Sequence, residues 1–366
     1  MSGLGQADLL IDLAALVANW RRIADMVAPA ETAGVVKANG YGLGAAEVAR
    51  ALSAAGCRTF FVAHPAEAHA LRPLLPAGHA IFVLHGAPEG AGATLAGAGI
   101  VPVLNTLPEI EAFAALGRAR GGLPAAIQID TGMTRLGLQE GEVEAITARP
   151  GLLDGIELRL VMSHLACADE RASPMNARQH VEFERLRRLL PPAPASLANS
   201  AGCFLGREFH LDLVRPGIAL YGGRVLVDGP NTMREVVRIV AKILQVHAID
   251  TPRTVGYGAS HSMPAGGRIA TVAVGYADGY PRALGNRGFA VIDGFRVPVV
   301  GRVSMDLLTL DVSALPSQSI RVGQDVHILG GGVPADELAA LAGTIDYELF
   351  TRLGARYRRT YLGRAA

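Results

Sequence analysis

The chain has 366 residues and a formal net charge of +1; half of its residues are hydrophobic and 18% are charged. This composition can fill a sizeable core and argues against wholesale disorder. The balanced charge excludes a strongly basic face for nucleic acid or for a membrane surface, and no apolar stretch reaches the ~18 residues that span a bilayer.

The first residues, MSGLGQADLL, lack the basic residues of a secretory signal, and Asp8 and Asp12 interrupt the apolar run there. The cysteines Cys57, Cys167 and Cys203 are scattered and show no CxxC spacing, which is typical of a reducing compartment. We therefore expect a cytoplasmic protein without a disulfide framework. No pair of histidines has convincing metal-ligand spacing, so we expect no metal site.

Apolar residues at helical spacing predict a helix over residues 11–26. Short apolar runs then alternate with stretches of helical composition, such as 44–55, 108–118 and 174–190. This alternation predicts a parallel (β/α)8 TIM barrel, and an open doubly wound sheet is the alternative. The predicted barrel strands are 33–37, 59–63, 80–84, 100–104, 126–130, 156–162, 196–199 and 211–215.

Beyond the turn-rich stretch 227–233, apolar runs follow one another without long helices between them. They predict a second domain that is mostly antiparallel β, with one short helix over 335–342. We therefore assign residues 9–228 to the barrel and 229–366 to the β domain, and residues 1–8 can pack with the latter. The predicted strands of this domain are 236–249, 268–275, 289–294, 297–303, 307–312 and 325–329.

Lysine is scarce in this chain. Of the 34 basic residues, all but Lys37 and Lys242 are arginines. Arginine stays charged and cannot form an imine, whereas lysine can lose its proton and can also form a covalent bond to a carbonyl carbon. A lysine that persists among so many arginines is therefore a candidate for chemistry that arginine cannot perform.

Polar residues end several predicted barrel strands, and in such barrels catalytic groups lie at the carboxyl ends of the strands. These residues are Lys37, Asp130, His164, Asn199 with Ser200, and Arg215.

Glycines accompany two of these strand ends, and they allow backbone N–H groups to approach an anion closely. Gly40, Gly42 and Gly44 follow Lys37, and Gly217 follows the eighth strand. The loops after strands seven and eight commonly bind phosphate in such barrels. The pattern predicts a phosphate ligand that faces a lysine, which is either its counter-ion or a reactive amine.

Nine motifs, in order and spacing, resemble those of the bacterial alanine racemase family, and they span nearly the whole chain. They are VVKANGYGLG, IQIDTGMTRLG, VMSHLA, LANSAG, LVRPGIALYGG, VGYGA, VGYADGYPR, GRVSMD and TIDYE. The resemblance implies a barrel that holds pyridoxal 5′-phosphate (PLP), followed by a β domain. It also implies a homodimer with shared active sites that interconverts L-alanine and D-alanine, supplying D-alanine for peptidoglycan.

The resemblance also implies residue roles. Lys37 would bind PLP covalently and act as one base, and Tyr257 of the partner subunit would act as the other. Arg135 and Met305 would bind substrate, the latter through its backbone N–H. The other cofactor-binding residues would be Tyr41, His164, Asn199, Ser200, Arg215, Gly217, Ile218 and Tyr347, and the corridor to the site would be lined by Tyr276, Arg282, Asp306 and Ile345.

One departure from the family pattern concerns Gln128. Many members carry a lysine there, modified to a carbamate whose negative charge orients the arginine at the position of Arg135. An amide cannot be carbamylated. We expect the carbonyl oxygen of Gln128 to accept a hydrogen bond from Arg135 instead, which would keep the orientation without the charge. The site would then either tolerate the positive charge of Arg135 or recruit a small anion such as chloride beside Gln128, and we favour the anion because a desolvated guanidinium without a counter-charge is costly.

Three other functions compete with this interpretation. A PLP-dependent decarboxylase of similar architecture needs a cysteine in its C-terminal domain, yet no cysteine follows Cys203. A PLP-binding homeostasis protein without enzymatic activity resembles the barrel alone, whereas this chain continues into a second domain that contains Tyr257, Met305 and Tyr347. A racemase of broader substrate range stays open, because one or two methylene groups change discrimination by only ~1–3 kcal/mol.

Overall fold

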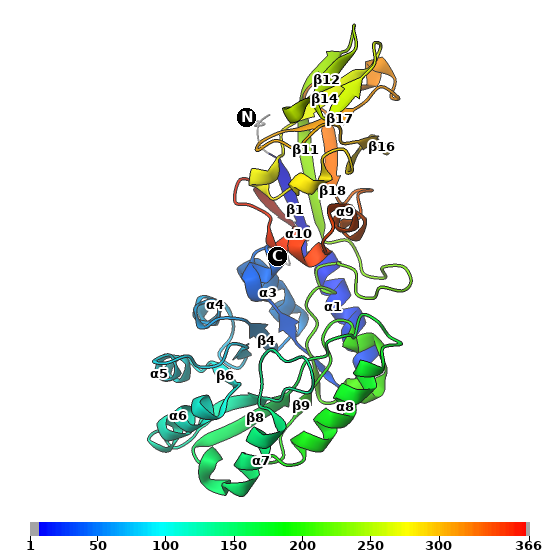
Figure 1. Ribbon diagram of the computed structural model, residues 1–366. Coiled ribbons are helices and arrows are strands. Elements are labelled where there is room, and N and C mark those ends of the chain that lie inside the picture. The colour runs from blue at the N-terminus through cyan, green and yellow to red at the C-terminus, as the bar shows by residue number, and fades with distance from the viewer. Residues whose placement is uncertain (1–6, 364–366) are drawn as a thin grey trace.

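The computed structural model describes residues 7–363, and its first half alternates strands and helices around a barrel (Figure 1). Seven parallel strands form one sheet in chain order, β3 to β9. Their bounds are β3 Gly34–Val35, β4 Thr59–Val62, β5 Ala80–Val83, β6 Val101–Leu104, β7 Leu123–Gln128, β8 Ile156–Met162 and β9 Ala195–Ser196.

The eighth predicted strand closes the ring. β10 (Leu213–Val214) pairs in parallel with β2 (Glu31–Thr32), which one residue separates from β3. On its other side, the N–H of Arg215 donates to the carbonyl of Ala198 at 2.9 Å. The predicted (β/α)8 barrel is confirmed; most strands are shorter than their apolar runs, whereas β8 matches its run and β7 begins earlier.

The helix expected over 11–26 is α1 (Leu13–Val27), and its N-terminus is capped by Asp12, whose side chain accepts the N–H of Ala15 at 2.9 Å. Such a cap satisfies one of the free N–H groups of the first turn. The remaining helices of the barrel are α3 Ala45–Ala55, α4 Pro65–Leu71, α5 Gly92–Gly97, α6 Leu107–Arg118, α7 Glu140–Ala148 and α8 Pro174–Arg187, and the short segment α2 Lys37–Tyr41 is a left-handed turn.

The second half is built on one long strand, β11 (Val237–Ala248), which pairs antiparallel with three others. The mostly antiparallel β domain predicted from the sequence is therefore confirmed. Its other elements are β12 Arg253–Val255, β13 His261–Met263, β14 Arg268–Val272, β15 Phe289–Ile292, β16 Phe295–Pro298, β17 Leu308–Asp311, β18 Asp325–Leu329, α9 Ala335–Ala342, α10 Asp346–Thr351 and β19 Arg358–Leu362.

The strand β1 (Asp8–Asp12) belongs to this second sheet, where it lies between β11 and β19. Leu9 and Ile11 are fully buried and alternate with partly exposed residues, which is the pattern of a strand with one face on a core. Residues 9–12, which we expected in the barrel, therefore pair within the β sheet. Residues 1–6 lie outside the described part, and the division of the chain at residue 228 stays a prediction.

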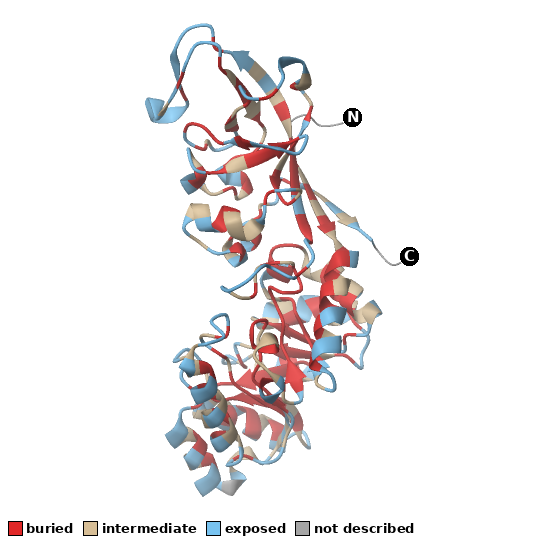
Figure 2. Ribbon diagram, turned by 90° about the vertical axis from the view of Figure 1, so that its right-hand side faces the viewer, coloured by how far each residue is buried: buried red, intermediate tan, exposed pale blue. Residues whose placement is uncertain are grey.

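Buried residues form a large cluster that runs through the barrel and along β11 (Figure 2). The end of the molecule where Figure 1 places β12 is largely exposed in Figure 2 and has a small cluster of its own. Within residues 7–363, no helix is both long and apolar enough to cross a membrane.

The burial of Leu9 makes β1 testable. Leu9→Ala removes a side chain with 0% exposure, so we expect the free energy of unfolding to fall by about 2–5 kcal/mol. Val181→Ala is the control, because Val181 is 66% exposed on α8, and it should change stability by less than about 0.5 kcal/mol. Urea unfolding measures both, and equal small effects would contradict a core position for β1.

Candidate active site

A cavity of about 460 Å³ opens at the carboxyl ends of the barrel strands. Part of its wall comes from the other half of the chain, because Ile345 and Tyr347 at the start of α10 also line it. The structure brings together there the predicted residues Lys37, Tyr41, Arg135, His164, Asn199, Ser200, Arg215, Gly217, Ile218, Ile345 and Tyr347.

The chain leaves β3 through a left-handed turn directly after Lys37. Ala38, Asn39, Gly40 and Tyr41 have φ angles of 53°, 54°, 62° and 52°. For residues other than glycine, this conformation costs ~1–2 kcal/mol each. It persists only where the surroundings determine it. The turn places both Lys37 and Tyr41 on the cavity wall.

Contacts from two parts of the molecule stabilise this turn. The Glu67 carboxylate accepts the N–H of Ala38 at 2.6 Å. From β19, Arg359 donates to the carbonyl of Gly42 at 2.7 Å. The sequence pattern did not single out either contact. Glu67 could have been found from the sequence, because an acidic residue three positions after a helix N-cap commonly accepts backbone N–H groups there. The contact of Arg359 could not, because no local pattern indicates a partner 317 positions away.

Hydroxyl and N–H groups converge on one side of the cavity. The hydroxyl of Ser200 accepts the N–H of Gly217 at 2.8 Å, and the ring of Tyr41 lies 6.2 Å from that of Tyr347. A Cβ atom at Gly217 would lie 2.0 Å from the Tyr41 hydroxyl, so only glycine allows this approach. Among the described contacts, the N–H of buried Ile218 has no partner. This set, called the anion site below, suits a phosphate.

Arg215 is a buried cation beside this set. It is 5% exposed, and its guanidinium donates to the hydroxyl of Ser196 and the carbonyl of Ser163. Burial lowers the pKa of Arg215 to about 10, so it remains charged at neutral pH. The two acceptors offset part of the desolvation cost of a buried charge.

The charges of the cavity lower the pKa values of two of its residues, His164 and Lys37. Burial, followed by Arg215, Arg135 and Lys37, lowers the pKa of His164 to about 3, so this histidine is neutral at pH 7. Burial also lowers the pKa of Lys37, as do Arg135 and Arg215, while Glu67 opposes them. A lysine with a lowered pKa is a better proton acceptor near neutral pH than an ordinary one.

The loop that carries Arg135 is held by Asp130, whose carboxylate accepts the N–H groups of residues 132–134 at 2.9 to 3.0 Å. Gln128 differs from our expectation. Its amide N–H donates to the carbonyl of Leu136 at 2.9 Å, and the described contacts include no hydrogen bond to Arg135. A buried amide N–H needs an acceptor, and this carbonyl is within reach. Gln128 thus supports Arg135 through the backbone.

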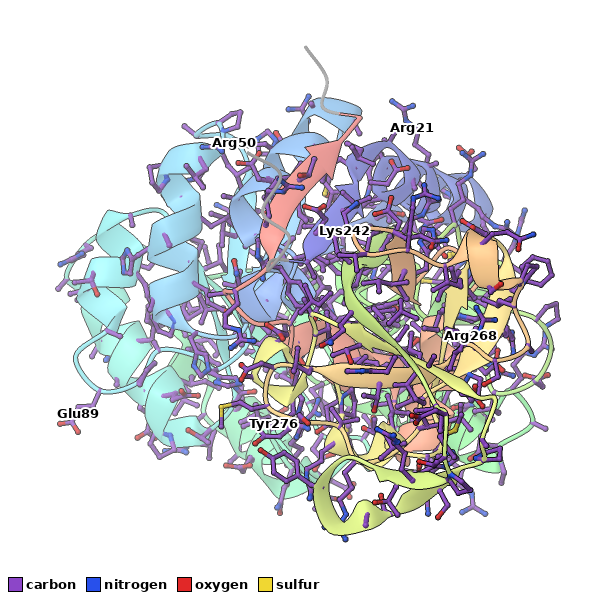
Figure 3. The ribbon with its side chains drawn as sticks, turned by 90° about the horizontal axis from the view of Figure 1, so that it is seen from above. Arg21, Arg50, Glu89, Lys242, Arg268 and Tyr276 are labelled. Carbon is purple, nitrogen blue, oxygen red and sulfur yellow. The ribbon has the colours of Figure 1, made fainter. Side chains whose placement is uncertain are left out.

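The remaining predicted residues do not line the cavity of the described chain. Tyr257 follows β12, at the end of the molecule far from the barrel, and it is 70% exposed. Tyr276 projects from the surface of the second half (Figure 3), and Met305 is 54% exposed. Arg282 is also exposed, and Asp306 forms an ion pair with Arg356 at 2.6 Å.

Asp346 does not line the cavity but supports its wall, and we had not singled it out, although the motif TIDYE contains it. It is 4% exposed, and burial raises its pKa. Its carboxylate accepts the N–H of Tyr347 at 2.9 Å and that of Arg224 at 2.5 Å. Asp346 therefore connects the end of the barrel segment to the helix that carries Tyr347.

The lowered pKa of His164 predicts a pH dependence of stability in the cofactor-free protein. Between pH 6.5, the ordinary pKa of histidine, and about pH 3, His164 is protonated in the unfolded chain but neutral in the folded chain. The free energy of unfolding should therefore fall as the pH is lowered through this range. We expect His164→Asn to reduce the fall between pH 7 and pH 5 by up to about 2 kcal/mol in urea unfolding.

The exposed His69 on α4 supplies the control for this experiment, because it lies outside the cavity. His69→Asn should leave the slope of stability against pH as it is in the parent protein. A slope in His164→Asn that equals that of the parent would contradict a neutral His164 in the cavity wall.

Comparison with known proteins agrees with this architecture. The family model "Alanine racemase, N-terminal domain" matches residues 11–225, and that for the C-terminal domain matches residues 236–361. The Rhodospirillum rubrum protein named alanine racemase is 52% identical over 97% of this chain and 96% of its own. An Agrobacterium fabrum protein named "Alanine racemase, catabolic" is 48% identical over 99% and 93%.

Solved structures give the same relationship. The crystal structure of alanine racemase from Bartonella henselae with covalently bound pyridoxal phosphate has a TM-score of 0.94 and 40% identity, covering 98% of this chain and 99% of that one. The biosynthetic alanine racemase from Pseudomonas aeruginosa has a TM-score of 0.90 and 35% identity over 97% and 99%. By sequence over both halves and by structure throughout, this chain belongs to the alanine racemase family.

Proposed function

We propose that this chain is a PLP-dependent racemase that interconverts L-alanine and D-alanine. The observation that carries the proposal is one cavity that is lined both by Lys37, a lysine with a lowered pKa, and by the anion site. PLP has an aldehyde for such a lysine and a phosphate for such a site. Family membership, and the PLP held by the Bartonella henselae relative, support the same assignment.

The residues present fit this cofactor. Lys37 would hold it covalently, and Tyr41, Ser200 and Tyr347 with the N–H groups of Gly217 and Ile218 would bind its phosphate. Bound PLP supplies the electron sink that stabilises negative charge at the α-carbon of an amino acid. Arg215 would donate to the ring nitrogen, with His164 and Asn199 beside it, and Arg135 would lie near the substrate.

Arg215 also favours racemisation over transamination. Its charge opposes protonation of the nitrogen to which it donates, because two positive charges would then meet. With PLP bound, Arg215 would therefore limit how far the ring withdraws negative charge, which would favour return of a proton to the α-carbon of the substrate. The burial of Arg215 and its two protein acceptors hold the guanidinium in place for this role.

Racemisation needs a base on each face of the α-carbon, and we propose Lys37 for one face. The other candidate bases in the cavity of one chain are poorly suited: burial raises the pKa values of Tyr41 and Tyr347 well above 10, and burial keeps His164 neutral with a very low pKa. The remaining carboxylate of the cavity wall, Glu348, is engaged in an ion pair with Arg352 at 2.6 Å. We therefore propose Tyr257 of the partner subunit for the other face.

A homodimer follows from this assignment. Tyr257, Tyr276, Met305 and Ile345 are each exposed, and a partner subunit commonly covers exposed large hydrophobic residues. The backbone N–H of Met305 of the partner subunit would bind the substrate carboxylate. The partner's Tyr276, Arg282 and Asp306 would line the corridor to the site together with Ile345. D-Alanine made in the cytoplasm would serve peptidoglycan synthesis, as the resemblance implies.

The direct test is a chiral assay on the purified protein with PLP, over a panel of L-amino acids. We expect D-alanine to form, and we expect Lys37→Ala to abolish it, since loss of a positioned base alone costs ~10²–10⁴ in rate. Borohydride should fix the cofactor to the peptide that contains Lys37.

Lys242→Ala is the matched control, because this other lysine lies on β11 in an ion pair with Asp325 (Figure 3). Lys242→Ala should keep both the racemisation of alanine and the borohydride label on the peptide that contains Lys37. A label on Lys242 would overturn the role of Lys37, and equal rates on larger amino acids would replace alanine by a broader substrate range.

Complementation tests the shared site. Lys37→Ala and Tyr257→Phe subunits should each be inactive as homodimers. A heterodimer would own one site with both bases intact, so statistical mixing should restore roughly a quarter of the parent activity. Differently tagged subunits verify exchange. Absence of any recovery despite exchange would place both bases within one chain.

A further inference from the structure

We propose that Glu67 is a positioning residue that fixes Lys37 at the cavity by holding the first residue of the left-handed turn. The inference rests on the proposed function of Lys37 and adds a residue that acts through it. Glu67 itself does not line the cavity, and it reaches the cavity wall only through its contact with Ala38.

The contacts of Glu67 connect two neighbouring strand ends. One carboxylate oxygen accepts the N–H of Ala38 at 2.6 Å, directly after Lys37. The other oxygen accepts the N–H groups of Ala63 and His64, at 2.8 and 3.2 Å, where the chain leaves β4. Because β3 and β4 are paired, this half-buried carboxylate locks the lysine segment onto the adjacent strand of the barrel.

Both oxygens of the carboxylate are needed for this arrangement. Each faces N–H donors that belong to a different loop. A glutamine of the same shape has one acceptor oxygen, and its amide N–H₂ would face a donor on one of the two sides. Hydrogen bonds to an ionised acceptor are also stronger than those to a neutral one. Loss of the charge should therefore release Ala38 or the β4 loop.

Glu67 also acts on Lys37 through its charge. The charged groups that influence Lys37 are Arg135 and Arg215, which disfavour its protonated form, and Glu67, which favours it. Removal of Glu67 would leave the lysine facing two cations. A purely structural defect elsewhere in the barrel would not produce this electrostatic change.

Glu109 provides a matched control. Like Glu67 it lies three positions after a helix N-cap, and its carboxylate accepts the N–H of Asn105 at 2.7 Å, at the end of β6. It makes no contact with the left-handed turn among the described hydrogen bonds. Glu109→Gln therefore removes the same kind of cap at another strand end.

The first experiment uses the cofactor-free protein. Acetic anhydride acylates Lys37 and Lys242, and mass spectrometry follows both rates against pH, with Lys242 as internal reference. In Glu67→Gln we expect the Lys37 profile to move to lower pH. Amide hydrogen exchange over residues 38–44 should also rise about tenfold, the effect of losing a hydrogen bond to a charged group. Glu109→Gln should match the parent in both.

The second experiment measures racemisation of alanine with PLP. We expect kcat of Glu67→Gln to fall about tenfold while KM changes little, because the reacting amine is displaced and not the substrate contacts. Adding Ala38→Gly should restore part of kcat, since glycine adopts this left-handed conformation without strain. If Glu67→Gln alone does not fold, the double variant Glu67→Gln with Ala38→Gly is compared with Ala38→Gly alone.

Two outcomes would overturn the role of Glu67. One is a Glu67→Gln protein whose Lys37 profile and kcat equal those of the parent. The other is a Glu109→Gln protein that shows the same losses as Glu67→Gln. Both are distinct from failure of the proposed function, in which the parent protein itself neither racemises alanine nor takes up the label at Lys37.

Discussion

The left-handed turn after Lys37 is the constraint on which the rest of the site depends. Its backbone is unfavourable for alanine, asparagine and tyrosine, so it exists only because other contacts determine it. Glu67 holds its start from within the barrel, and Arg359 holds its end from β19. The barrel alone therefore does not contain all the contacts that position its reactive lysine.

The cavity also carries an excess of positive charge. Lys37, Arg135 and Arg215 line it, and the pKa of His164 beside them is lowered first by burial and then by these three cations, so this histidine stays neutral. An excess of positive charge in a partly enclosed space attracts an anionic ligand. The anion site, with its hydroxyl and N–H donors, lies next to these cations, so the cavity favours a phosphate-bearing molecule before any covalent bond is considered.

The barrel and most of the cavity could be predicted from local sequence. Alternating apolar runs defined the strands, and polar residues at strand ends, such as His164 and Arg215, marked the site. Long-range pairing could not be predicted in this way. The sheet partner of β1 and the contact of Arg359 with residue 42 join segments more than 200 positions apart. The hydrogen-bond partner of Gln128 could not be predicted either, because it is a backbone carbonyl in the loop that carries Arg135, and composition does not reveal where that carbonyl points.

The parallel pairing of β1 with β19 has a consequence for the order of events during synthesis. β19 also supplies Tyr361, whose hydroxyl donates to the carbonyl of Leu43 at 2.9 Å, next to the contact of Arg359. Arg359 and Tyr361 are synthesised some 300 positions after Lys37, whose segment they help to hold. The pairing of β1 with β19 likewise cannot form until the end of the chain has been made. The nascent barrel consequently lacks part of the support for its lysine until β19 has emerged.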